Sequence, residues 1–103
     1  MQKIYKDIFG NTIRLTHERL DHITEREEMV GQDNKIAETL LSPDIVKFSK
    51  YDPDVLLYYK LYEHTPVTRK FLAVIAKVGV AEPFILSSFF TDKIKEGETR
   101  WQS

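Results

Sequence analysis

Two apolar runs joined by a short link constrain the fold of this chain more than any other stretch. They cover Phe71–Val78 and Phe84–Phe90, and the link between them carries Gly79 and Pro83. Both runs are rich in Val, Ile and Phe, each has the length of a strand, and each is bounded by Gly or Pro, which disfavours a helix. The sequence therefore predicts two buried β-strands joined as a hairpin.

Polar residues interrupt both runs. Lys77 lies inside the first run, and Ser87 and Ser88 lie inside the second. Burial of an unpaired ammonium costs free energy, so a lysine in such a strand either faces water or has a functional role.

The N-terminal half predicts a small hairpin and two helices. Short β-prone runs, 3–9 and 12–15, flank Gly10-Asn11, a pair suited to a tight turn. Thr16 is the expected N-cap of a helix from His17 to about Met29. A second helix begins at Asp33 or Asn34 and ends before Ser42-Pro43, because the residue before a proline is disfavoured in a helix.

The remaining strands are expected over 44–50 and 55–62, and the tail from Asp92 is polar. Two early helices followed by an antiparallel meander indicate an α+β domain. We expect one domain over residues 1–103, with the two N-terminal helices packed on one face of an antiparallel sheet of about four strands, and with the short hairpin as an N-terminal addition.

Composition excludes several classes of protein. The chain has no cysteine, and its three histidines are not spaced as ligands for one ion, so we expect no metal site and no cofactor. No apolar stretch approaches the ~20 residues that span a bilayer, and the N-terminus does not resemble a signal peptide, so a cytoplasmic protein without a membrane partner is expected. The net charge of −1 means that nucleic-acid binding would need a local basic patch.

A set of polar side chains on apolar elements forms the candidate site. His22 lies about 100° round the first helix from Ile23, at the margin of the apolar stripe. Histidine is the side chain that ordinarily titrates closest to neutral pH. Strand alternation gives Ser87 and Thr91 a common face, and Lys77 lies on the preceding strand, although the pairing register cannot be fixed from sequence.

Several stretches, taken in order, resemble a known family. They are RLTHERLDHI, ETLLSPDIV, LLYYKLY, FLAVIAKV, FILSSFFT and IKEGETRW, and together they cover nearly the whole chain. Their order and spacing are similar to the barnase–EndoU–colicin–RelE-like nucleases, in the small branch associated with phages and mobile elements. Two positions depart from the family pattern: Arg26-Glu27-Glu28 replaces a second histidine followed by proline, and Phe89 replaces a tyrosine.

The resemblance implies metal-independent cleavage of RNA, often by a toxin that is paired with an antitoxin or immunity protein. By position, the family's catalytic groups fall on His22, Lys77, Ser87 and Thr91. Tyr58 and Tyr62 are candidates for stacking on a base, and Arg69 is a further candidate for substrate binding.

Structural roles are the alternative for each of these residues. His22 fits a hydrogen-bonded helix–sheet histidine, Lys77 an exposed lysine, Ser87 a packing residue, and the tyrosines core aromatics. The functional alternative is a catalytically inactive module that binds RNA or a partner protein.

Overall fold

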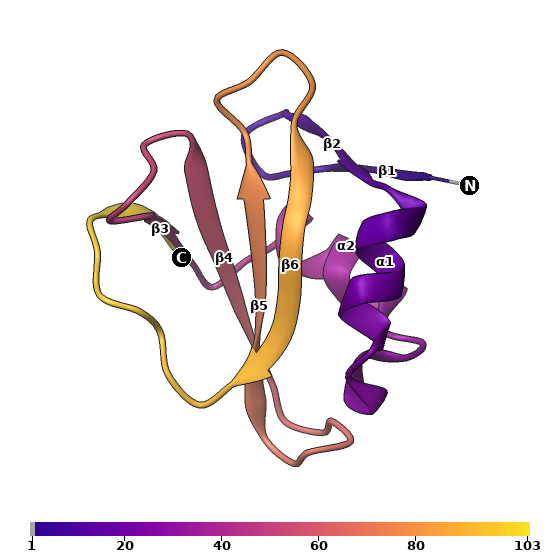
Figure 1. Ribbon diagram of the computed structural model, residues 1–103. Coiled ribbons are helices and arrows are strands. Elements are labelled where there is room, and N and C mark those ends of the chain that lie inside the picture. Colours follow the sequence, from indigo (N-terminus) through magenta and orange to yellow (C-terminus); the bar gives the residue numbers. More distant parts are fainter. Residues whose placement is uncertain (1) are drawn as a thin grey trace.

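The computed structural model describes residues 2–103, which form one seven-stranded sheet and two short α-helices (Figure 1). The strands are β1 (Lys3–Lys6), β2 (Thr12–Leu15), β3 (Ile45–Phe48), β4 (Val55–Tyr62), β5 (Lys70–Lys77), β6 (Phe84–Thr91) and β7 (Thr99–Gln102). The helices are α1 (His17–Thr24), the 3-10 helix η1 (Glu27–Met29) and α2 (Asp33–Leu41). In space the strands follow the order β1-β2-β6-β5-β4-β3-β7.

The expected arrangement of two helices on an antiparallel sheet of about four strands is therefore wrong. The four expected strands are present as the antiparallel meander β3–β4–β5–β6, but three more strands extend it. Strand β7 pairs with β3 at one edge, and the N-terminal hairpin joins β6 at the other through a parallel pair, Arg14 with Phe84, which makes the sheet mixed. The short β7 has mostly exposed residues, so it lacks the alternation that reveals a strand.

The two faces of the sheet have separate sets of buried side chains. One face, here the helix face, carries the main core, which includes Ile13, Leu15, Ile23, Ile36, Leu40, Leu56, Tyr58, Leu72, Val74 and Ile85. The opposite face, here the far face, carries a smaller cluster of Leu57, Tyr59 and Ala73, with Ile75 and Phe89 packed against it. Strands β4 and β5 have buried apolar side chains on both faces, which shows that both faces of the sheet are partly covered.

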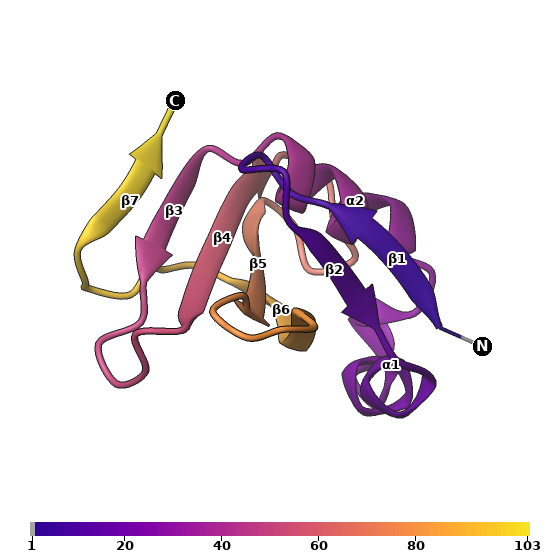
Figure 2. The ribbon, with the colours of Figure 1, turned by 90° about the horizontal axis from the view of Figure 1, so that it is seen from above.

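The two helices occupy different places. Helix α2 packs behind the sheet against β5, β1 and β4, whereas α1 lies along β6 (Figures 1 and 2). Only Phe84 of β6 pairs with β2, so the rest of this strand has no strand partner on its outer side, and α1 and η1 pack there instead.

Helix α1 is shorter than expected. The predicted N-cap is confirmed, since the Thr16 side chain accepts a hydrogen bond from the backbone N–H of Arg19 at 3.2 Å. The helix ends at Thr24 and not near Met29, because Arg26 takes an extended conformation. The hydroxyl of Thr24 also donates to the carbonyl of Leu20, a local bond that competes with helical structure.

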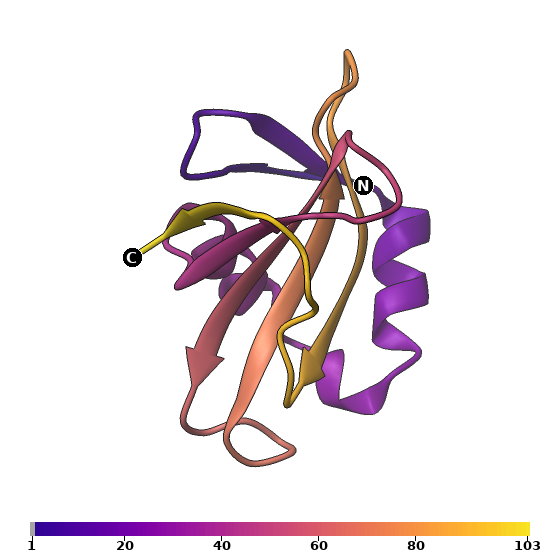
Figure 3. The same ribbon diagram turned by 90° about the vertical axis from the view of Figure 1, so that its left-hand side faces the viewer.

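The far face is crossed by the segment that links β6 to β7 (Figures 1 and 3). Ile94 packs against the far-face cluster, and the backbone N–H of Lys95 donates to the Tyr59 hydroxyl at 3.3 Å. The Arg100 guanidinium on β7 lies 4.0 Å from the ring centre of Phe9, which ties β7 to the loop of the N-terminal hairpin. None of the helices within residues 2–103 is long and apolar enough to cross a membrane.

Candidate functional site

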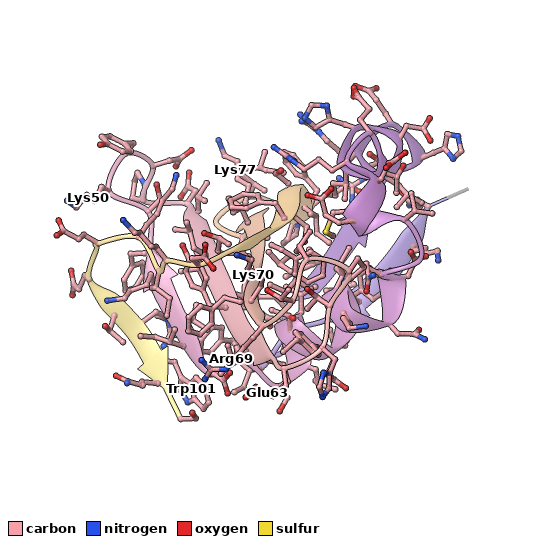
Figure 4. All side chains as sticks on the ribbon, turned by 90° about the horizontal axis from the view of Figure 1, so that it is seen from below. Lys50, Glu63, Arg69, Lys70, Lys77 and Trp101 are labelled. Atoms are coloured by element: carbon pink, nitrogen blue, oxygen red, sulfur yellow. The ribbon has the colours of Figure 1, made fainter. Side chains whose placement is uncertain are left out.

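Lys77 and Ser87 lie on neighbouring strands and on the same face of the sheet. Ser87 is the register partner of Ile75, and Leu57 pairs with Ile75 from the other side, so all three belong to the far face. Lys77 follows Ile75 by two residues and therefore shares this face. Figure 4 shows Lys77 on the same side of the sheet as Lys50 and well away from Arg69.

The Lys77 ammonium is partly buried and held by a carboxylate. Its Nζ lies 3.2 Å from Oδ2 of Asp52, and the two side chains are 32% and 37% exposed. The backbone N–H of Asp54 and then the Lys77 ammonium lower the pKa of the Asp52 carboxyl. The Lys77 ammonium has two further N–H donors for a ligand, since an ammonium carries three.

The neighbouring serines differ in their surroundings. Ser88 is buried on the helix face, and its hydroxyl donates to the carbonyl of Ala73 at 2.8 Å. Ser87 is half-buried, and within residues 2–103 its hydroxyl has no hydrogen-bond partner. The Ser87 hydroxyl is therefore free to bond to a ligand on the far face.

Arg26, two residues after the end of α1, reaches this same face. The guanidinium of Arg26 lies 5.6 Å from the ring centre of Phe89, a far-face residue two positions after Ser87. His22 lies in the last turn of α1, four residues before Arg26, which itself lies beyond the end of the helix. Ser87 precedes Phe89 by about 7 Å along the strand. Helix α1 and β6 are in contact and run in the same direction (Figure 1), so α1 carries His22 along the outer side of the strand that carries Ser87.

The His22 imidazole faces solvent. Its side chain is 60% exposed, and Nδ1 lies 3.5 Å from Oε2 of Glu25 in the next turn. Ile23, the next residue, is fully buried and anchors α1 in the core. The His22 ring is therefore open to solvent on a helix that is anchored in the core.

A pocket of about 420 Å³ adjoins Lys77 on the far face. Val55, Leu57 and Ile75 form its apolar floor, and Val55 is the register partner of Lys77. The remaining lining comes from the β3–β4 turn and from the crossing segment, with Phe48, Ser49, Lys50, Tyr51, Lys95 and Glu96. Tyr51 is 94% exposed at the rim.

Two predicted site residues lie away from this cluster. Thr91 shares the far face but is about 13 Å from Ser87 along β6, and its hydroxyl is bonded to the backbone of Lys93. Arg69 precedes β5 and lies about 26 Å along the strand from Lys77. Its Nε is paired with the Glu63 carboxylate at 3.0 Å. The structure therefore does not bring Thr91 and Arg69 to the Lys77–Ser87 cluster.

The two tyrosines expected to stack on a base lie on the helix face. Tyr58 is fully buried, which leaves no room for a base against its ring. Burial and then the hydrogen bond to Asp7 raise its pKa above the ordinary range. The Tyr62 hydroxyl donates to Glu38 of α2 at 2.6 Å, and burial followed by this bond raises the pKa of Tyr62. Both residues tie β4 to neighbouring elements on the side away from Lys77.

Sequence reasoning missed two charged residues at the site, Asp52 and Arg26. Asp52 lies between the strands expected over 44–50 and 55–62, and its approach to Lys77 depends on the β4–β5 register. The contact of Arg26 with Phe89 depends on the early end of α1.

The far face offers an ammonium, a guanidinium and a hydroxyl, and the neighbouring helix α1 carries the exposed His22 imidazole. Within residues 2–103 no three His, Asp or Glu side chains are grouped to hold a metal ion. We found no family model, no curated protein and no solved structure that matches the chain.

Proposed function

We propose that this protein is an endoribonuclease that cleaves RNA without a metal ion, by attack of a ribose 2′-hydroxyl on the adjacent phosphate. The observation that carries the proposal is that Lys77 of β5 and Ser87 of β6 share the far face, and that α1 packs along β6. The order of sequence motifs that resembles the nuclease family supports the same reaction.

The proposed chemistry divides among three side chains. The 2′-oxygen forms a bond to phosphorus, its proton leaves to a base, and the bond from phosphorus to the 5′-oxygen breaks as that oxygen takes a proton. His22 is the proton-transfer group, a role that typically contributes 10²–10⁴-fold in rate. The Lys77 ammonium and the Ser87 hydroxyl stabilise the charge that develops on the non-bridging oxygens. The products are a 2′,3′-cyclic phosphate and a free 5′-hydroxyl.

The pocket beside Lys77 supports a nucleotide as the substrate. Its apolar floor fits a planar base, and the exposed Tyr51 ring at its rim can stack on a neighbouring base. Lys50, Lys95 and Glu96 line the same pocket, and Lys50 is paired with Glu96 at 3.4 Å, so Lys95 leaves the lining with a positive charge although the whole chain has a net charge of −1.

A nuclease of this kind would act on RNA in the cytoplasm as a toxin. A protein inhibitor, an antitoxin or immunity protein, would then be its partner, and the far face is the surface such an inhibitor would have to block.

A catalytically inactive module that binds RNA or protein is the second candidate. It is favoured by the departures from the family pattern, since Arg26-Glu27-Glu28 replaces a second histidine followed by proline and Phe89 replaces a tyrosine.

Cleavage of a short RNA in the presence of EDTA tests the reaction. We expect cleavage, with a 2′,3′-cyclic phosphate detected by mass spectrometry. A single 2′-deoxy nucleotide at the cleaved position should abolish cleavage there, because the nucleophile is missing. Cleavage that persists at the deoxy position would exclude the proposed mechanism. Binding of the RNA without cleavage would favour the inactive module.

A further inference from the structure

We propose that Asp52 is a positioning residue, which fixes the Lys77 ammonium over the far face so that it meets the phosphate of the substrate. This inference rests on the proposed function. A lysine side chain is long and flexible, and an ammonium stabilises a developing charge only if it is held in place before the reaction. The 3.2 Å contact between Asp52 Oδ2 and Lys77 Nζ provides that restraint.

The Asp52 carboxylate is itself held in place. Its second oxygen, Oδ1, accepts the backbone N–H of Asp54 at 2.9 Å. The Ser49 hydroxyl accepts the backbone N–H groups of Tyr51 and Asp52 at 3.2 and 3.3 Å, which closes the turn around it. These bonds leave the carboxylate few alternative positions.

The turn is also tied to the end of β5, where Lys77 lies. The backbone carbonyl of Asp54 accepts the N–H groups of Val78 and Gly79 at 2.7 and 3.1 Å. A side chain at position 79 would collide with Asp54, so the glycine permits this close approach. Backbone hydrogen bonds therefore link the β3–β4 turn to the end of β5, next to the Asp52–Lys77 pair.

A role for Asp52 as the general base is less consistent with its surroundings. The Asp54 N–H and Lys77 both stabilise the carboxylate and lower the pKa of Asp52, which makes it a poor proton acceptor at neutral pH. The same contacts suit a group that stays ionised and holds a cation.

Steady-state kinetics on the RNA substrate tests the positioning role. We expect Asp52→Asn to lower kcat by about 10- to 100-fold with little change in KM, because misplacement of a catalytic group mainly affects the transition state. Asp52→Glu should recover part of the loss. In a Lys77→Met background the Asp52→Asn change should have no further effect. Asp54→Asn is the matched control in the same turn, and it should leave kcat unchanged.

A full kcat in Asp52→Asn, or an equal further loss in the Lys77→Met background, would overturn the proposal. The NMR signal of the Lys77 ammonium provides a second readout, which does not depend on RNA cleavage. We expect the signal to be sharp in the wild type and in Asp54→Asn, and broadened by solvent exchange in Asp52→Asn. If the wild type cleaves no RNA, the proposed function fails. The NMR signal then still decides whether Asp52 holds Lys77, because an unchanged signal in Asp52→Asn contradicts it.

Discussion

The Tyr58 hydroxyl donates a 2.5 Å hydrogen bond to Oδ2 of Asp7, and both side chains are buried. The same carboxylate accepts the backbone N–H groups of Phe9 and Asn11 and the side-chain amide of Asn11. This one carboxylate therefore joins the turn of the N-terminal hairpin to the centre of β4.

Replacing Tyr58 by Phe should destabilise the fold. The variant loses a hydrogen bond to a charged acceptor, which contributes about 1.5–3 kcal/mol to the free energy of unfolding. Urea denaturation would measure the loss. Tyr51→Phe is the control, because Tyr51 is almost fully exposed. Equal stability of Tyr58→Phe and wild type would contradict the role given to the Asp7 contact.

The pH dependence of stability should reveal the Asp52–Lys77 pair. The folded pKa of Asp52 is lowered, so its contribution is present above the unfolded pKa and is lost as the pH falls through the folded value. We expect the difference in unfolding midpoint between wild type and Asp52→Asn to shrink from pH 7 to pH 3. A difference that stays constant over this range would show that ionised Asp52 does not stabilise the fold.

Ser87 and Ser88 form a matched pair for separating function from packing. Ser87→Ala should lower the cleavage rate roughly 10- to 100-fold, because one hydrogen bond to a charged group is lost in the transition state. Its melting temperature should not change. Ser88→Ala should cost about 1 kcal/mol of stability through the lost bond to Ala73, with normal activity. Loss of activity in Ser88→Ala, with normal activity in Ser87→Ala, would contradict the placement of the functional hydroxyl on the far face.

The sequence predicted helices and strands correctly where the signal came from neighbouring residues. The apolar runs predicted β5 and β6, and Thr16 predicted the start of α1. The two faces of β4 could not be told apart, because Leu57 and Tyr59 on one face are as apolar as Leu56 and Tyr58 on the other. For that reason Tyr58 was assigned to the site when it belongs to the core.

The pairing of strands that are distant in sequence also could not be predicted from the sequence. The β5–β6 register shifts between Ile75 and Ala76, and this irregularity sets where Ser87 falls relative to Lys77. The parallel pair between Arg14 and Phe84 joins residues 70 positions apart, and no local signal marks it. Both features depend on tertiary packing, which a one-dimensional pattern does not encode.

Initial rates of RNA cleavage in EDTA by His22→Ala and His17→Ala test whether His22 is the proton-transfer group. Both histidines are exposed on α1, and each lies near a carboxylate of its own helical turn or the next, so the two variants are closely matched. We predict that His22→Ala loses about 10²–10⁴-fold in rate, as expected for removal of a proton-transfer group, while His17→Ala retains the wild-type rate. Equal rates for the two variants would show that His22 does not transfer the proton.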